Sequence, residues 1–256
     1  MPSGNHGFLR RPKPPFLTAE WRYLLMLNYE IDPAILRPLV PRGTELDPWE
    51  GHTLISLVGF RFLGTRIGGW SVPGHRDFDE INLRFYVRRR DSPGWRRAVV
   101  FILEIVPRPA IALVARMVYH EPYRSLPMRH TLRMDGAHRG EPGLIRYEWR
   151  QADRWYRLEG WTTGTPVTPA AGSEAEFITE HYWGYTARRD GGCLEYQVAH
   201  PPWRVWGTSS ASLECDVGRM YGSGFEEALR PPPRSAFVAE GSSVAVFRGV
   251  QLREPV

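Results

Sequence analysis

A strictly alternating segment at residues 80–87 constrains the fold more than any other part of this sequence. Extended backbone points successive side chains to opposite faces. One face of a strand here carries an acid, an amide, a guanidinium and a phenol, from Glu80, Asn82, Arg84 and Tyr86. The other face is apolar, with Ile81, Leu83, Phe85 and Val87. Four different hydrogen-bonding groups on one face indicate the wall of a polar pocket. The alternative is an outer strand with a structural Glu–Arg pair.

The rest of the chain has the pattern of a β-dominated α+β domain. Its 25 Gly and 23 Pro are spread along the sequence, as expected for many strands separated by turns. Strands are predicted at residues 24–29, 53–63, 80–87, 98–106, 129–134, 144–150, 154–161, 193–198, 210–216, 236–239 and 243–247. We expect a single domain at residues 16–256, preceded by a Pro/Arg-rich arm at residues 1–15.

Two short helices are predicted in the first half of the chain. Asp32 is the expected N-cap of the first, with Pro33 at its first helical position. The second covers residues 110–119, carries Arg116 and ends at Glu121-Pro122.

A third helix is predicted from a capping box. Ser173 stands three residues before Glu176, and the helix is expected to run to about residue 186. Phe177, His181 and Tyr185 would then share one stripe. His181 is a candidate ligand-binding residue, with a core or interface histidine as the alternative.

Glu104 interrupts an otherwise apolar strand at residues 98–106. A lone carboxylate is costly to bury unless a cation or hydrogen bonds compensate it. Arg84 and Arg108 are the candidate partners, and the strand register that would decide between them is not fixed by the sequence. Glu104 is therefore either half of a structural ion pair or an acid/base group.

Lysine is nearly missing from this sequence. Lys13 is the only lysine among its 33 Lys and Arg residues. A guanidinium stays protonated and forms no Schiff base, so chemistry that needs a lysine in the core is excluded. The net charge of +5 does not indicate nucleic acid, because arginines and acids are interleaved along the chain.

The sequence gives no sign of a metal, a cofactor or a membrane segment. Cys193 and Cys215 are too few for a disulfide framework or a cysteine zinc site, and the eight histidines form no pair at ligand spacing. No apolar stretch reaches the roughly 18 residues of a membrane-spanning helix, and no signal sequence is visible. We expect no cofactor, no metal, no nucleic-acid or membrane partner, and a cytoplasmic location.

Five stretches resemble the YqjF-like family of uncharacterised bacterial proteins, domain of unknown function 2071. They are residues 16–22 (FLTAEWR), 36–41 (LRPLVP), 79–87 (DEINLRFYV), 104–108 (EIVPR) and 180–185 (EHYWGY). That family is similar to acetoacetate decarboxylase as a remote relative. The resemblance implies a closed antiparallel β-barrel or cone, with a few flanking helices and an internal pocket.

The sequence departs from acetoacetate decarboxylase at the catalytic lysine. The decarboxylase has an adjacent lysine pair after a proline, shortly after a strand glutamate that Glu104 resembles. Here the proline is followed by Arg108, which forms no imine. The resemblance therefore does not carry over Schiff-base decarboxylation.

The leading hypothesis is an internal pocket that binds a small organic acid or another polar metabolite. Arg84 or Arg108 would clamp a carboxylate, and Asn82 and Tyr86 would orient it. Arg116 and His181 complete the candidate ligand-binding set. If the protein is an enzyme, it is lyase-like without a catalytic lysine, and Glu80 or Glu104 is the acid/base group, its pKa raised by burial.

Two alternatives stay open. The same pocket could serve a receptor or sensor without turnover. The chain could instead be an interaction protein with an Arg- and Trp-rich surface, whose anion-contacting tip is the hairpin of Arg88, Arg89, Arg90, Arg96 and Arg97. Its ten Trp leave room for a homodimer without requiring one.

Overall fold

The structure is a computed structural model that describes residues 14–91, 94–188 and 190–252. The predicted Pro/Arg-rich arm lies outside the described residues, except for Pro14 and Pro15. Ser92 and Pro93 of the predicted hairpin turn are also outside them, although Asp91 and Gly94 pair on either side.

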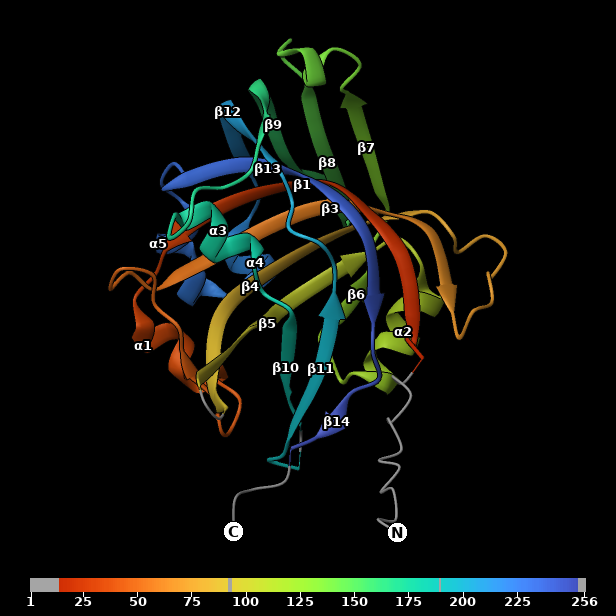
Figure 1. The fold of residues 1–256 in the computed structure, drawn as a ribbon, viewed down its shortest axis with the longest axis vertical. Helices are drawn as coiled ribbons and strands as arrows, with labels where there is room; N and C mark the ends of the chain where they lie inside the picture. The colour runs from red at the N-terminus through yellow and green to blue at the C-terminus, as the bar shows by residue number, and fades with distance from the viewer. Residues whose placement is uncertain (1–13, 92–93, 189, 253–256) are drawn as a thin grey trace, which may run out of the picture.

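The main feature of the fold is a sheet that closes into a ring (Figure 1). Closure occurs because the last long strand pairs with the first strand on one side and with β11 on the other. In ring order the strands are β1 (Leu17–Glu30), β3 (Leu54–Ile67), β4 (Phe78–Asp91), β5 (Gly94–Val106), β10 (Trp183–Ala187), β11 (Cys193–Ala199) and β13 (Ser235–Val246). The expected closed, β-dominated architecture is confirmed. One expectation is corrected: the pairing of β10 with β5 is parallel, not antiparallel.

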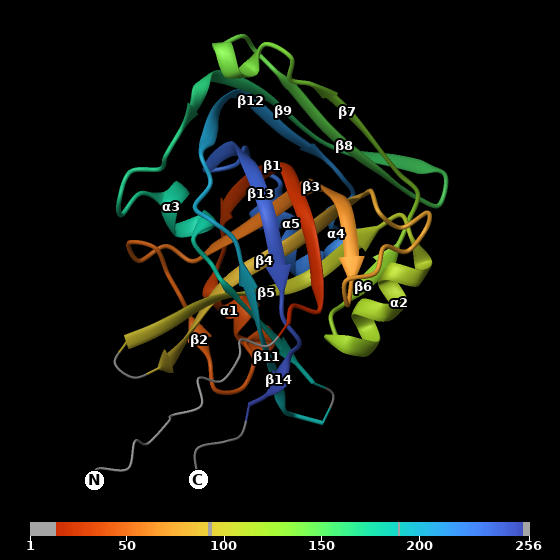
Figure 2. The ribbon, with the colours of Figure 1, turned by 45° about the vertical axis from the view of Figure 1, so that its right-hand side comes forward.

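A second layer of strands covers one side of the ring (Figure 2). It continues from β13 through β12 (Val205–Glu214), β9 (Arg154–Val167), β8 (Leu144–Gln151) and β7 (Met128–Arg133). The strands predicted at residues 129–134, 144–150 and 154–161 are thus present as β7, β8 and β9. Glycines allow the layers to approach closely: a Cβ on Gly59 of β3 would lie 2.6 Å from Tyr147 Cδ2 of β8.

Strand β4 contributes to two different cores. Its odd-numbered residues Ile81, Leu83 and Phe85 are buried with Tyr147 and Leu158 of the second layer. Its even-numbered residues point the other way, into the interior of the ring, where the apolar neighbours are Val58, Phe60 and Val99 among others. One face of β4 therefore packs in the core between the two layers, and the other face lies toward the internal cavity, as the alternation in the sequence predicts.

Short elements fill the connections. The helices are α1 (Pro33–Leu36), α2 (Pro109–Val118), α3 (Glu174–Thr179), α4 (Val217–Tyr221) and α5 (Glu226–Leu229), with 3-10 turns η1 (Arg37–Leu39), η2 (Ala137–Arg139) and η3 (Ser223–Phe225). The short strands are β2 (Glu45–Leu46), β6 (Tyr123–Ser125) and β14 (Val250–Gln251). Asp32 caps α1 as predicted, its Oδ1 accepting from Ala34 N at 2.8 Å. Within the described residues, no helix is both long and apolar enough to cross a bilayer.

The helix predicted to reach residue 186 is much shorter in the structure. Ser173 caps it as expected, but α3 ends at Thr179 and Glu180 leaves the helical region at φ −93, ψ 58. Residues 183–187 form β10 instead, paired with both β5 and β11. A capping box specifies only where a helix begins, whereas the strand is decided by ladder partners that are distant in sequence.

The two strands predicted at 236–239 and 243–247 are one strand, β13. It passes through Gly241, which has φ +77 and whose added Cβ would lie 1.9 Å from the Trp21 carbonyl oxygen. Glycine at this position lets the strand bend without ending.

Candidate ligand-binding cavity

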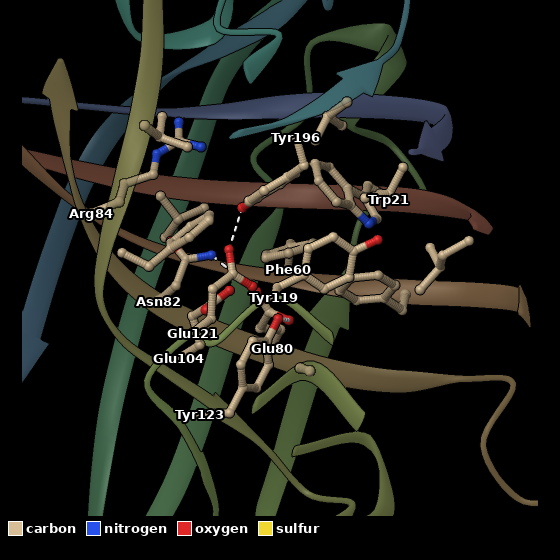
Figure 3. Close-up of a pocket in the computed structure, with 18 of the residues that line it drawn as sticks. Trp21, Phe60, Glu80, Asn82, Arg84, Glu104, Tyr119, Glu121, Tyr123 and Tyr196 are labelled. Carbon is tan, nitrogen blue, oxygen red and sulfur yellow. Dashed lines mark hydrogen bonds between the residues drawn. The ribbon is translucent and has the colours of Figure 1, made fainter. Parts of the chain in front are cut away.

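The ring encloses a cavity of about 120 Å³ (Figure 3). This is close to the roughly 150 Å³ space that holds one benzene molecule, so a ligand of similar size fits. Most of the lining is apolar or aromatic. Trp21 meets Phe60 at 5.2 Å between ring centroids, and Phe62 stacks on Phe78 at 4.5 Å. Helix α2 contributes Ile111, Val114 and Ala115 to the same wall.

Three glutamates meet in this cavity, and we call Glu80, Glu104 and Glu121 the carboxyl cluster. They come from β4, from β5 and from the segment before β6, and each is less than 7% exposed. The β4–β5 register sets Glu104 opposite Asn82, and the parallel β5–β6 pairing sets it opposite Tyr123. Backbone pairing therefore gathers the cluster from three segments.

Within the described part of the chain, only neutral groups donate hydrogen bonds to the carboxyl cluster. Asn82 Nδ2 donates to Glu80 Oε1 and the Tyr123 hydroxyl donates to Glu80 Oε2, both at 3.1 Å. The Tyr196 hydroxyl donates to Glu121 Oε1 (Figure 3).

Burial raises the pKa of all three carboxyls. The pKa of Glu80 rises to about 7, because desolvation outweighs the hydrogen bonds from Asn82 and Tyr123. Desolvation likewise raises the pKa of Glu121 to about 8. For Glu104, desolvation and then the neighbouring charges of Glu121 and Glu80 raise the pKa well above 4.5. Glu80 and Glu121 therefore exchange protons near neutral pH rather than near pH 4.

Arg84 and His181 line a part of the cavity away from the carboxyl cluster (Figure 3 shows Arg84). Arg84 is half-buried and its Nη2 donates to the Ile178 carbonyl at 3.1 Å. Among the described residues, no carboxylate forms an ion pair with it. His181 is buried against the Tyr86 and Phe177 rings, and burial together with the charges of Arg97 and Arg84 lowers its pKa well below 6.5. Its imidazole is therefore neutral.

Several buried polar atoms of the cavity lining find no hydrogen-bond partner among the described protein atoms. They are Trp21 Nε1, Asn82 Oδ1, Arg84 Nε, Glu104 Oε2, and both ring nitrogens of His181. Leaving one such group unsatisfied costs about 1–3 kcal/mol. A bound molecule or water with both donors and acceptors would offset that cost.

Five of the predicted site residues line the cavity together: Glu80, Asn82, Arg84, Glu104 and His181. Tyr86 is on the same face of β4, but it is not a lining residue. Its ring packs against that of His181. Its hydroxyl is 2.5 Å from Ser56 Oγ, and Ser56 in turn donates to Asn28. The Tyr86 hydroxyl is therefore hydrogen-bonded to a neighbouring residue of the ring.

The structure does not bring Arg108 or Arg116 to the cavity. Arg108 is exposed at the N-cap of α2, and Arg116 is exposed on that helix. The face of α2 toward the ring carries Ile111, Val114 and Ala115, at helical spacing, and Arg116 falls outside that stripe. Of the three predicted arginines, Arg84 is therefore the one that lines the cavity.

The expected arginine partner of Glu104 is also missing. The register places Asn82 opposite Glu104, and an irregularity between Leu83 and Arg84 shifts the pairing beyond it. Neither Arg84 nor Arg108 forms an ion pair with Glu104 in the described structure.

Sequence reasoning missed Glu121, Tyr123 and Tyr196. Glu121-Pro122 was interpreted only as the end of a helix, whereas Glu121 enters the cavity. The alternation of Tyr119, Glu121 and Tyr123 was the available signal. Among the described residues, no group of three or more His, Cys, Asp or Glu is arranged to hold a metal ion.

The strand ring is similar to the fold of acetoacetate decarboxylase-like proteins of known structure. The structure aligns with acetoacetate decarboxylase from Legionella pneumophila at a TM-score of 0.64, with 13% identity over 97% of this chain and 94% of that one. It aligns with an acetoacetate decarboxylase-like enzyme from Sphingomonas wittichii RW1 at 0.64, with 12% identity over 99% and 100% of the two chains. The enduracididine biosynthesis enzyme MppR, complexed with pyruvate, gives 0.65, with 12% identity over 98% and 95%. At these identities the likeness shows the fold.

Within that fold the chain belongs to the DUF2071 family, described as an uncharacterized conserved protein, whose model matches residues 18–243. It is 30% identical over 202 residues to the uncharacterized protein YqjF of Bacillus subtilis (strain 168), covering 78% of each chain. The family resemblance seen in the sequence motifs is thus confirmed.

Proposed function

We propose that this protein binds a small organic acid in the ring cavity, with Arg84 as the carboxylate-binding residue. The proposal rests on the lack of a carboxylate partner for the Arg84 guanidinium among the residues that the structure describes. Its guanidinium lines the cavity, its Nε lacks a partner, and no carboxylate of the described chain neutralises it. A guanidinium recognises a carboxylate through two parallel hydrogen bonds.

The carboxyl cluster gives the same cavity acid–base capacity, so we propose a lyase-like enzyme that moves protons on the bound acid. A carboxyl whose pKa is about 7, as for Glu80, is matched to giving and taking a proton at neutral pH. The described lining contains no lysine, which speaks against an imine with the protein. Structural neighbours named as a decarboxylase and as a pyruvate complex support the class of ligand. The expected cytoplasmic location would give access to such acids.

Binding measurements on an arginine variant test this function. Titration calorimetry with linear carboxylic acids of three to seven carbons is expected to find a ligand for the wild type. Arg84→Ala should weaken its binding by at least about 30-fold, the effect of removing one partner of a buried charge pair. Arg116→Ala is the matched control, because Arg116 is an exposed arginine outside the cavity.

Two results would contradict the proposal: a folded Arg84→Ala variant that binds as the wild type does, or no binding of any acid by the wild type. If Arg84→Ala does not fold, Arg84→Gln provides the same test with a longer side chain.

A receptor without turnover is the second candidate, and one observation favours it. The described residues that line the cavity include no serine, cysteine or lysine nucleophile. Rapid-quench experiments under single-turnover conditions separate the two functions. Chemical change in the bound acid supports the enzyme, and its unchanged recovery supports the receptor.

A further inference from the structure

No cation of the described residues pairs with the carboxyl cluster. The remaining buried carboxylates of the described residues each have an arginine nitrogen nearby: 2.7 Å from Arg97 to Asp47, 3.3 Å from Arg61 to Asp79, and 2.6 Å from Arg96 to Glu195. Glu80, Glu104 and Glu121 have only neutral donors around them. A chain rich in arginine thus places three buried carboxyls where no guanidinium reaches them.

The unpartnered atoms of the cavity differ between its two ends. Near the cluster they include Asn82 Oδ1, which only accepts hydrogen bonds, and Glu104 Oε2, which accepts when ionised. Asn82 is 3% exposed and lines the cavity, and its Oδ1 has no hydrogen-bond partner among the described protein atoms. Of the other unpartnered atoms, Arg84 Nε and Trp21 Nε1 are donors, and the neutral His181 ring has one donor and one acceptor nitrogen. A complementary ligand donates at the cluster and accepts at Arg84.

Aromatic rings surround the acceptor end. Tyr123 and Tyr196 are hydrogen-bonded to the cluster, and the Tyr119 ring lies 4.9 Å from that of Tyr196. Aromatic faces beside carboxyl groups favour an organic cation through cation–π and charge-assisted contacts.

We propose that the ligand is an amino acid in the broad sense: a small organic acid whose carboxylate binds Arg84 and whose protonated amine binds the carboxyl cluster and the Asn82 oxygen. This inference rests on the proposed function, since it adds a second charge to the same ligand. Arg84 stands two residues beyond Asn82 along β4, and Glu104 is opposite Asn82. Two residues of strand span roughly 7 Å. Because the strand sets the two groups apart along its length, we take a linear ω-amino acid as the probe.

Binding of an ammonium group changes the protonation of its surroundings. The titratable groups that face it are Glu80, Glu104 and Glu121, with the phenols of Tyr119, Tyr123 and Tyr196. A nearby positive charge favours the ionised form of a carboxyl and lowers its pKa. Binding at neutral pH is therefore expected to release protons to the buffer.

Matched probes test the inference. We would titrate 5-aminopentanoate, pentanoate and pentylamine into the wild type at neutral pH, in two buffers of different ionisation enthalpy. The amino acid is expected to bind at least about tenfold tighter than pentanoate, as for hydrogen bonds to a charged group, with measurable proton release. Glu104→Gln should remove this preference, because an amide cannot become an anion. Glu214→Gln, an exposed carboxylate of β12, is the control that should keep it.

The outcomes separate the two proposals. If pentanoate binds as tightly as 5-aminopentanoate, without proton release, the inference is overturned while the acid-binding function stands. If neither acid binds, nor any of the three- to seven-carbon acids, the proposed function itself fails. Should Glu104→Gln not fold, Glu121→Gln serves as the second variant, since its amide oxygen still accepts from Tyr196. A preference unchanged in both folded variants would also overturn the inference.

Discussion

Two regions of this molecule bury carboxyl groups in opposite ways. At one end of β4 and β5, which we call the arginine end, Glu195 receives hydrogen bonds from Arg96 at 2.6 Å and from the Tyr185 hydroxyl at 2.7 Å. Arg89 lies 3.6 Å from the same carboxylate. In the carboxyl cluster, by contrast, the three glutamates pair with no cation from residues 14–91, 94–188 or 190–252.

The difference determines how each set of buried carboxyls responds to a change of charge. A buried carboxylate held by guanidinium groups keeps a fixed charge, and removing its partner leaves an uncompensated charge. Buried carboxyls without a cation hold their protons to higher pH and respond to any charge that enters. The arginine end stabilises the sheet, whereas the cluster is able to change its charge.

The same comparison bears on the interaction-protein alternative. The hairpin expected to contact anions has most of its arginines engaged within the protein. Arg88 pairs with Glu45, Arg97 with Asp47, and Arg96 with Asp91 and Glu195. These contacts leave less positive charge for an acidic partner, which favours the cavity as the functional site.

The largest effect expected from this contrast is on the pH dependence of stability. The folded protein holds protons on Glu80 and Glu121 up to about pH 7 and 8, above the ordinary 4.5. Unfolding therefore releases protons, and the free energy of unfolding falls as pH rises from about 5 to 8, by roughly 1.4 kcal/mol per pH unit for each titrating carboxyl. Urea denaturation across that range measures the slope. Glu121→Gln should flatten it and Glu214→Gln should not; an equal slope in both would refute the raised pKa.

A smaller loss is expected when the arginine end is broken. Glu195→Gln leaves Arg89 and Arg96 without their shared carboxylate, and should lower the free energy of unfolding by roughly 2–3 kcal/mol. The cost stays below that of a fully buried pair because the two arginine side chains are 27% and 21% exposed. The shift in urea midpoint at unchanged m-value is the measurement. No shift would mean that this end is not structural.

Glu104→Gln should have less effect on stability than Glu195→Gln. The amide has nearly the same shape as the protonated carboxyl that burial favours, so we expect a change below about 1 kcal/mol at neutral pH. Denaturant titration beside Glu195→Gln provides the direct comparison. A loss as large as that of Glu195→Gln would show that Glu104 is ionised and paired in the folded protein.

The smallest effect is expected at the rim of the arginine end. Arg88 bonds to the half-exposed Glu45, and Arg88→Ala should cost about 0.2–1 kcal/mol, as for other exposed ion pairs. Added salt should reduce the difference from wild type, because it screens exposed charges. A salt-independent loss would instead indicate that the Arg88 stem packs on Trp95, over whose ring its guanidinium lies at 4.4 Å.

The sequence by itself determined the features that depend on neighbours along the chain. The period of two at residues 80–87 fixed which side chains of β4 share a face, since alternation follows from extended backbone alone. The caps at Asp32 and Ser173 fixed where two helices begin. The scarcity of lysine excluded imine chemistry in the core, whatever the fold.

Only the tertiary structure decided which side chains lie together inside the ring. The β4–β5 register set Glu104 opposite Asn82 rather than beside an arginine, and the parallel pairing of β6 drew Tyr123 and the preceding Glu121 into the cavity. The orientation of α2 about its axis places Arg116 outside the cavity. Residues 183–187 were predicted as helix but form a strand, because they pair with neighbouring strands. Register, helix rotation and strand pairing are set by packing between segments far apart in sequence, and no local pattern encodes them.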